Sequence, residues 1–423
     1  MSKTVVSAAF AAALLSFVVP RTSAAEGSEA AAFPVKTTEL DWKETLRRAR
    51  ERGPLTSLAR SRIAEAEARR VDAEIFPRQN PVLEVGAGPR LIGTDPDSPY
   101  VQIALSQPID MGGGRSARLR LAEAGVATAR AETDADAQLA SREAGGAFLR
   151  ALWAGERAKL AEQSLESARA ALASAKKRLE AGDATALEVN VARSGLARAG
   201  AALRGYEAER EAALGLVRVL AGVDPKQTIE LRGDLADPLL ADRSRLSKAA
   251  LARPEIRALA AEVEAARAQE DLSDALAWPQ LGLGAAYQLE DKNVHTVFGT
   301  LSLTLPIFER AQGLGAEARA RLARAERAEA ATAERVQGEV ATALGVLRKR
   351  DAAIHAFDEQ GGVEAFRENM ALAGRGYAAG ETSLSDLLLM QRELVETEAD
   401  RLDRLLELRA TELEALAAAG ALR

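Results

Sequence analysis

Two acidic residues at matched places could carry chemistry in this sequence. Glu188 stands six positions after Gly182, and Asp386 stands six positions after Gly380. Each glycine interrupts a long helix-forming run, so each carboxylate is expected in the first turns of a helix. A carboxylate there can stabilise the positive end of the helix dipole. Several carboxylates crowded around one narrow opening would instead select for cations. Both roles stay open at this point.

No other group of side chains predicts catalysis or a resident metal. Of the two histidines, His295 falls in an expected surface loop and His355 on an expected helix, and neither has carboxylates at metal-ligand spacing. The chain has no cysteine and only four methionines, which excludes thiolate chemistry, disulfides and a methionine relay. The glycines at 112–114 lack the flanking strand–Lys–Ser/Thr pattern of a phosphate loop, so we expect a strand-to-helix hinge there. We predict no enzyme, no cofactor and no metal site.

The composition is that of long helices that pack through small residues. Only 4% of the 423 residues are aromatic, and alanine, arginine, glutamate and leucine dominate. The 56 basic and 62 acidic residues are interleaved, as on solvated helix faces with intrahelical ion pairs. Because no basic block stands out, we expect no nucleic-acid partner.

The first 25 residues read as a secretory signal. Lys3 precedes the apolar stretch VVSAAFAAALLSFVV, and small residues offer a cleavage point near Ala24 or Ala25. The stretch is shorter than the ~20 residues of a membrane-spanning helix. No later apolar run is long enough for such a helix. The mature chain is therefore expected to be soluble or to cross a membrane as strands.

The rest of the chain is organised as an internal duplication. Three pairs of residues keep one offset of 198 positions: Pro81 with Pro279, Pro108 with Pro306, and Gly182 with Gly380. One gapless register over about a hundred residues indicates two copies of a large unit. We assign the segments as an N-terminal extension (26–41), a first repeat (42–222), a linker (223–253) and a second repeat (254–421).

Each repeat is expected to contain the same elements in the same order. A helix is followed by two strand-like patches, a very long helix, the glycine break and a returning helix. The expected helices span 55–76, about 116–180 and about 184–221 in the first repeat, and 254–277, about 314–375 and about 382–420 in the second. A helix of about 65 residues is about 100 Å long, which suits a coiled coil, a rod or a tube.

The strand patches alternate apolar and polar side chains, as half-buried strands do. The apolar positions include Val101, Ile103, Leu105, Leu301, Leu303 and Leu305. Polar, turn-forming segments at 89–99 and 288–296 separate the paired strands. Strands of about ten residues match those of transmembrane barrels, but a small sheet capping a helical domain stays an alternative. Four strands cannot close a barrel, so the barrel would need several chains.

Three stretches together resemble the TolC-like outer-membrane efflux proteins. They are ALSQPIDMGGGRSARLRLAEA, SLTLPIFERAQGLGAEARARLARAE and GYAAGETSLSDLLLMQRELVETEADRLDRL. The similarity covers about residues 40–420, and LPIFERAQG is most similar to the cation-efflux (CzcC-like) branch. The resemblance implies a mainly α fold with a small β part. In it, a homotrimer forms a twelve-strand outer-membrane β-barrel that continues as a long α-helical barrel through the periplasm of a Gram-negative bacterium.

The same resemblance implies a function and partners. The chain would be the outer-membrane duct of a tripartite efflux system, with heavy-metal cations as the expected cargo. Its partners would be a periplasmic adaptor (membrane fusion) protein, an inner-membrane pump of the RND type and outer-membrane lipid. Drug efflux or type I protein secretion on the same architecture stays open. A periplasmic coiled-coil scaffold is a further alternative, but it would not need hairpins with wholly apolar faces.

The resemblance also assigns roles to particular residues. It places a periplasmic gate at Asp386, Glu188, Tyr377 and Arg375. It places the adaptor contact at the tip residues Gly182, Asp183, Gly380 and Leu384, and lipid against the six apolar strand residues named above. Two positions depart from the family pattern. Thr382 stands where some members have a gate arginine, which Arg375 would replace, and Leu389 stands where some members have a second aspartate.

Overall fold

The computed structural model describes residues 37–92, 95–240, 246, 250–290 and 294–422. The predicted signal segment, residues 1–25, and residues 26–36 of the predicted N-terminal extension lie outside these ranges. The description below concerns the unit from Thr37 onward.

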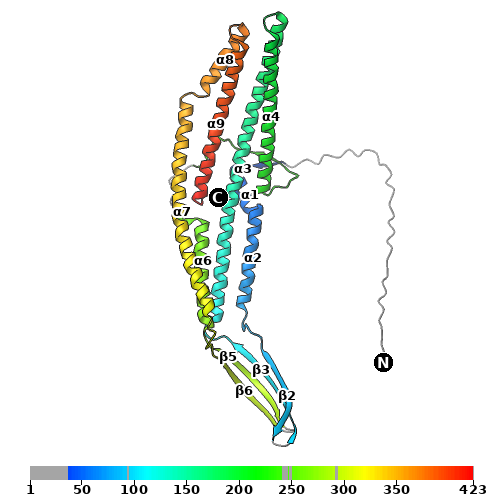
Figure 1. The fold of residues 1–423 in the computed structure, drawn as a ribbon, viewed down its shortest axis with the longest axis vertical. Helices are drawn as coiled ribbons and strands as arrows, with labels where there is room; N and C mark the ends of the chain where they lie inside the picture. The colour runs from blue at the N-terminus through cyan, green and yellow to red at the C-terminus, as the bar shows by residue number, and fades with distance from the viewer. Residues whose placement is uncertain (1–36, 93–94, 241–245, 247–249, 291–293, 423) are drawn as a thin grey trace, which may run out of the picture. The chain divides into compact units, whose positions relative to one another are not determined.

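The first repeat is built around one very long helix. Helix α3 (Gly114–Ala181) has 68 residues and is therefore about 100 Å long. It runs from the sheet to the far end of the unit, where α4 (Ala186–Leu220) turns back alongside it (Figure 1). Helix α2 (Pro54–Glu74) packs on the part of α3 nearer the sheet. These helices lie where the sequence predicted them, to within a few residues.

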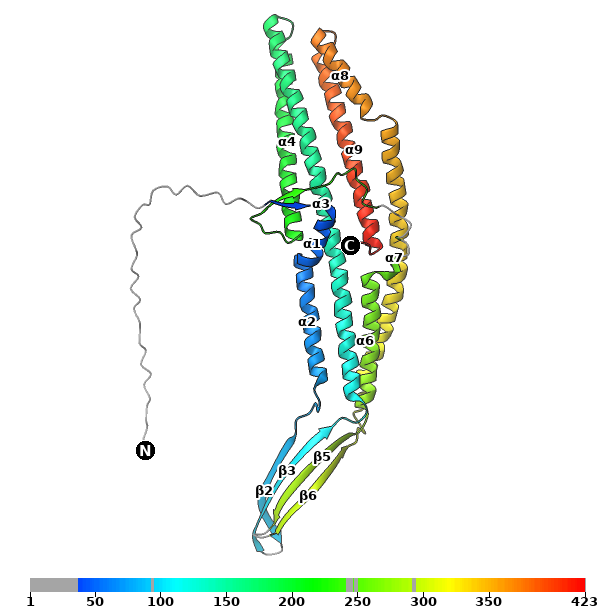
Figure 2. The same cartoon turned by 180° about the vertical axis from the view of Figure 1, so that it is seen from behind.

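The second repeat differs from the prediction in one helix. Its elements are α6 (Pro254–Leu276), α7 (Gln312–Glu359), α8 (Glu364–Ala379) and α9 (Leu384–Ala418). We expected one continuous helix over 314–375, and this was wrong, because a Gly361–Gly362 pair separates α7 from α8 (Figure 2). Among the described helices, none combines the length and the apolar character needed to cross a bilayer.

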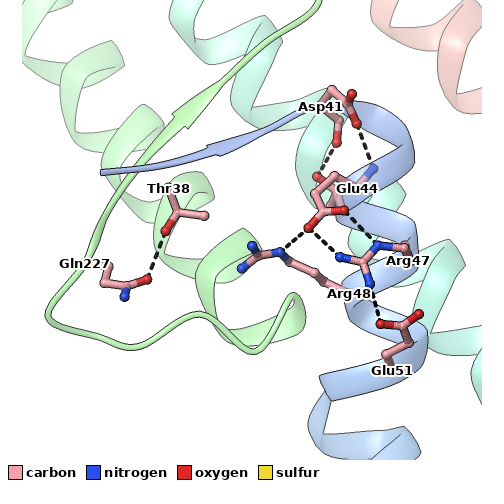
Figure 3. Close-up of polar contacts among 8 residues, drawn as sticks. Thr38, Asp41, Glu44, Arg47, Arg48, Glu51 and Gln227 are labelled. Carbon is pink, nitrogen blue, oxygen red and sulfur yellow. Dashed lines mark hydrogen bonds and ion pairs between the residues drawn. The ribbon is translucent and has the colours of Figure 1, made fainter. Parts of the chain in front are cut away.

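Three short elements within the predicted extension and linker were not foreseen. Strand β1 (Thr37–Leu40) pairs in parallel with β4 (Thr228–Leu231), and Thr38 Oγ1 donates to Gln227 Oε1 at 2.9 Å (Figure 3). A single turn of 3-10 helix, η2 (Ala250–Ala252), precedes α6. Residues about 190 positions apart thus form one small sheet beside the helices.

Helix α1 (Trp42–Arg52) begins with a dense polar cluster (Figure 3). The Asp41 carboxylate accepts a hydrogen bond from the backbone N–H of Glu44 at 2.7 Å and so caps the helix. Hydrogen bonds from Arg47 and Arg48 to the Glu44 carboxylate lower its pKa to about 2. Arg47 also pairs with Glu51. The cluster fixes the start of α1 beside the β1–β4 pair.

The main apolar core joins both repeats and the linker. It contains Leu46, Leu149, Leu235, Leu347, Ile354, Leu405, Leu408, Leu413 and Leu422. A buried ion pair between Arg409 and Glu412 on α9 holds the linker against this core. Arg409 donates to the carbonyl oxygens of Leu235 and Ala236, each at 3.1 Å, and Glu412 Oε2 accepts from the N–H of Leu239 at 3.0 Å.

A four-stranded antiparallel sheet lies at one end of the helices (Figures 1 and 2). Its strands are β2 (Val82–Ile92), β3 (Asp95–Ile109), β5 (Gln280–Glu290) and β6 (Val294–Thr304), in the order β2-β3-β5-β6. The strands extend into the segments 89–99 and 288–296 that we predicted as turns. The hydrogen-bonded ladder of each hairpin continues through these polar segments to the end of its strands. His295 therefore lies in β6 and not in a loop, with Nδ1 at 2.7 Å from Tyr287 Oη.

Candidate functional site

The register of the sheet gathers the alternating apolar residues on one face. Directly paired residues share a face, and Leu105 pairs with Leu83 while Leu303 pairs with Leu281. The six predicted lipid-facing residues belong to this face. It is open: Leu301 is 72% exposed and Val85 is 67% exposed. A protein in water rarely leaves such a continuous apolar face uncovered.

The opposite face of the sheet carries mostly polar and small residues and is crowded along β5. It carries small residues on β5, and Ala286 there is only 2% exposed. A Cβ atom added to Gly284 would lie 2.5 Å from the backbone oxygen of Leu105 and close to the Thr300 hydroxyl. Tyr100 Oη donates to Gln102 Oε1 on this face at 2.6 Å. The sheet thus has one crowded polar side and one free apolar side.

The sheet also has two free edges. Among the described strands, β2 pairs with β3 alone and β6 pairs with β5 alone. Both edge strands have 11 residues, and uncovered edges of this length are sites for pairing with another chain.

Each of the four connections between sheet and helices carries a large exposed apolar side chain. These are Phe76, Met111, Trp278 and Phe308, of which Phe308 is 90% exposed. The Arg115 guanidinium lies 5.7 Å from the centre of the Phe76 ring. A band of exposed apolar and aromatic residues therefore marks the boundary between the sheet and the helices.

At the opposite end of the unit, both helix pairs turn through the same backbone motif. Gly182 ends α3 with φ 85° and Gly380 ends α8 with φ 79°, the left-handed conformation that glycine adopts without strain. Asp183 N–H donates to the Arg178 carbonyl at 2.8 Å, and Glu381 N–H donates to the Gly376 carbonyl at the same distance. Both turns are Schellman motifs.

The two predicted gate carboxylates lie in the caps of the returning helices. Thr185 caps α4 in a capping box with Glu188, and the Ser383 hydroxyl accepts from the N–H of Asp386 at 3.2 Å. Ser383 Oγ also donates to the Asp386 carboxylate at 2.7 Å. We missed these caps in the sequence, although Thr185 and Ser383 stand 198 positions apart in the S/T-x-x-acid pattern that marks a helix start.

The two tips pack against each other through a small apolar core. It contains Ala171, Ala175, Val189, Ala192, Tyr377, Leu384 and Leu387. Val189 and Leu387 directly follow Glu188 and Asp386 in the chain, so this core brings the two acidic helix starts to the same region. Leu384 is only 3% exposed. Its assignment as a partner contact has to be corrected, because its side chain packs inside the tip.

Tyr377 joins the tips in a way that the sequence did not reveal. The residue is 4% exposed, and the Arg178 guanidinium of α3 lies 4.9 Å from its ring centre. Arg178 also donates to the Asp183 carbonyl at 3.2 Å. Residues 178 and 376 are matched positions of the repeat, yet one is arginine and the other glycine. This difference between the two repeats was the feature of the sequence that could have pointed to a separate role for Arg178 at the tip.

Other predicted positions form no site within one chain. Arg375 is exposed on α8, and across the described residues no ion pair to it is found. Gly182, Asp183 and Gly380 are exposed at the tips. In the part of the chain that the structure describes, no three His, Cys, Asp or Glu side chains are grouped as metal ligands.

The comparisons with known proteins agree with this architecture. A family model for outer membrane efflux proteins matches residues 55–223 and 246–421. No curated protein matches the sequence significantly. Solved structures share the fold: CusC has 18% identity and a TM-score of 0.72 over 90% of this chain and 92% of its own. OprN has 22% identity and a TM-score of 0.70, covering 96% of this chain and 98% of its own. The open state of the Neisseria gonorrhoeae channel MtrE has 19% identity and a TM-score of 0.69, covering 90% and 89%.

The family match spans most of the chain and both copies of the duplicated unit. The chain therefore belongs to the outer membrane efflux protein family, whose members are TolC-like transport channels and not enzymes.

Proposed function

We propose that this chain is the outer-membrane channel of a tripartite efflux system and works as a homotrimer. The observation that carries the proposal is the sheet, which has an open apolar face, a crowded polar face and two free edges. In a trimer, β6 of one copy would pair with β2 of the next, and twelve strands would close a barrel. The apolar faces would then contact lipid, and the small and polar residues would line the lumen.

The exposed residues at the sheet–helix boundary support this placement in a membrane. Aromatic side chains concentrate where a barrel meets the water interface. Phe76, Trp278 and Phe308 would occupy that level on the periplasmic side. The helices would then cross the periplasm, since α3 alone is about 100 Å long.

The tips would meet the partners of the channel. The exposed residues Gly182, Asp183 and Gly380 would contact a periplasmic adaptor, which would connect the duct to an RND-type inner-membrane pump. Leu384, Tyr377 and Arg178 would position these turns from inside the tip. Support for this assignment comes from the family and from the identical backbone of the two turns.

Heavy-metal cations are the cargo that we propose. The support is the LPIFERAQG stretch, which is similar to the cation-efflux branch of the family, together with the acidic residues at both helix starts. The duct would not bind the ions as a resident metal site; selection of the cargo would take place in the pump.

A deletion strain tests the function and the cargo together. We expect the strain to become sensitive to divalent heavy metals and to regain resistance when the gene is restored, with little change on a panel of drugs. Sensitivity to drugs alone would overturn the proposal that heavy metals are the cargo but would still support the channel function. Recovery of the protein from the soluble periplasm after a salt wash would overturn the duct itself and favour a scaffold.

The acidic helix starts can be tested for a role beyond capping. Asp386→Asn combined with Glu188→Gln keeps the hydrogen-bonding shape of both caps but removes six charges from a trimer. We expect the cation-over-anion permeability ratio in planar bilayers to fall several-fold, because a carboxylate ring attracts cations. Block by multivalent cations added on the periplasmic side should weaken as well.

A matched control is available at the same tips. Asp183→Asn with Glu381→Gln removes the same number of charges from the exposed turns, outside the helix starts. We expect this variant to change selectivity much less. Equal effects of the two double variants would mean that total tip charge matters and that no specific ring exists. No effect of either would leave Asp386 and Glu188 as helix caps.

A further inference from the structure

A cavity of about 410 Å³ lies at the sheet end of the helices, between α2, α3 and α6. This volume is within the roughly 300–1,000 Å³ that is typical of small-ligand sites. Much of the wall is apolar and comes from all three helices, including Ala66, Leu121, Ala265 and Leu272. The polar part of the wall contains three arginines, Arg69, Arg78 and Arg118. Such a cavity suits a ligand that has both an apolar part and a negative charge.

Arg118 is the buried arginine of this cavity and is only 8% exposed. Its Nη1 donates to Asp110 Oδ2 at 2.8 Å, but among the described residues its Nε and Nη2 have no hydrogen-bond partner. These two atoms form the edge of a guanidinium that can bind two oxygens at once. In this chain the same edge of Arg401 holds both oxygens of the Asp358 carboxylate, at 2.8 and 3.0 Å. Because buried donors without acceptors are costly, an oxyanion bound to Arg118 would be stabilising.

The second repeat builds the same strand-to-helix connection without this buried ion pair. Both connections enter their long helix through one left-handed residue, with φ 78° in the first repeat and φ 55° in the second. The positions that match Asp110 and Arg118 are nevertheless Phe308 and Ala316. The fold of the connection therefore does not require a buried arginine, which points to a separate role for Arg118.

Two further arginines lie beside the cavity, near the boundary with the sheet. Arg78 lines the cavity, its side chain is 46% exposed, and it lies 3.7 Å from the Asp72 carboxylate, which is too far for a hydrogen bond. Arg115, three residues before Arg118, lies over the exposed ring of Phe76, and among the described residues no ion pair to it is found. A surface that combines basic and aromatic side chains is typical of protein at the headgroup level of a membrane.

We propose that this cavity binds the phosphate headgroup of a phospholipid, with Arg118 as the buried anion-binding residue. Nε and Nη2 of Arg118 are covered in this structure, and Arg118 belongs to the cavity wall, so the phosphate would draw the guanidinium a short way into the cavity. The acyl chains would follow the exposed apolar face of the sheet, which includes Leu83 and Val85 on β2. The lipid as the source of the phosphate rests on the proposed channel function, but the anion site at Arg118 does not.

Binding to the purified protein in detergent, after bound lipid has been removed, tests the site. Three probes are titrated separately and followed by native mass spectrometry: phosphatidylglycerol, diacylglycerol and glycerol 3-phosphate. Diacylglycerol has the chains without the phosphate, and glycerol 3-phosphate has the phosphate without the chains. We expect phosphatidylglycerol to bind roughly tenfold more tightly than either, because a charge-assisted, two-oxygen contact adds to the burial of the chains.

Substitutions at the ion pair test the role of Arg118 directly. Arg118→Gln with Asp110→Asn removes both charges and still allows a hydrogen bond between the two side chains, and it should lower the affinity for phosphatidylglycerol to that for diacylglycerol. The matched control is Arg120→Gln with Asp271→Asn, which removes an exposed ion pair of 3.0 Å between α3 and α6 and should leave the affinity unchanged. If the first variant does not fold, Arg118→Lys keeps the charge without the two-nitrogen edge and should weaken binding several-fold.

The outcomes separate the site from its ligand and from the channel function. Equal affinity for phosphatidylglycerol in the wild type and in the Arg118 variants would overturn the site, even in a protein that conducts ions across bilayers. Tight binding of glycerol 3-phosphate that is lost with Arg118 would support the anion site and overturn the lipid as its ligand. Binding of phosphatidylglycerol through Arg118 in a protein recovered from the soluble periplasm would support the site and overturn the proposed function.

Discussion

Leu303→Arg should remove most of the folded trimer from the outer membrane. Leu303 pairs with Leu281 on the apolar face of the sheet and is 55% exposed in the single chain. If this face contacts lipid, an arginine near the middle of the barrel costs about 2–4 kcal/mol per chain. Three chains carry the substitution, and total stabilities of proteins are themselves small. The amount of trimer in purified outer membranes, measured by gel migration without heating, checks this expectation.

The neighbouring residue is the matched control. Thr304 pairs with Gln280 on the polar face, so its side chain points to the opposite side of the same strand. Thr304→Arg should leave trimer levels close to those of the wild type, since the charge would reach the water-filled lumen. Equal tolerance of both arginines would mean that the apolar face does not contact lipid, and the barrel proposal would fail.

Gly380→Val should abolish efflux while trimer levels in the outer membrane stay normal. Gly380 has φ 79°, a conformation that costs other residues roughly 1–2 kcal/mol and valine more. A Cβ atom at this position would meet nothing within 4 Å, so the penalty comes from the backbone alone. The turn should therefore change shape without disturbing packing elsewhere, and the adaptor would lose its contact. Growth on the toxic cargo and trimer quantification are the two measurements.

Two variants separate the backbone effect from other causes. Gly374→Val lies on the same helix, where an added Cβ also meets no atom within 4 Å and φ is not positive, so efflux should persist. Gly380→Asn should restore much of the activity, because asparagine is the residue other than glycine that most readily ends helices in this way. Loss of the trimer in Gly380→Val would show that the glycine serves folding and not docking.

The sequence alone was sufficient for the features that depend on local pattern. The offset of 198 positions is a property of the sequence itself, so the duplication and most of the helices in each copy could be predicted. Alternation along β3 and β6 predicted which residues share a face, because successive strand residues point to opposite sides. The glycines at 182 and 380 predicted the turns, since a left-handed residue is needed at the end of each helix.

Contacts between distant segments could be found only in the tertiary structure. Leu384 looked like an exposed tip residue, but the apolar core between the two tips buries it. Arg178 and Tyr377 are 199 positions apart, and although Arg178 departs from the repeat, neither local segment indicates that its guanidinium covers the Tyr377 ring. The pairing of β1 with β4 is likewise a contact between distant segments, because the chain brings these residues together only after the helices have packed.

The α7–α8 break lies between these two cases. Gly361 and Gly362 were visible in the sequence, and the first copy has no glycines at the matched positions. We did not predict a break there because the helical pattern continues on both sides of the two glycines. The sequence determined where the chain could bend, because glycine alone adopts the required φ without strain. The packing of Gly362 against Phe357, and the ion pairs to α9 on either side, decided that it does bend there. Local residue type sets what the backbone can adopt, and contacts across the fold select among those options.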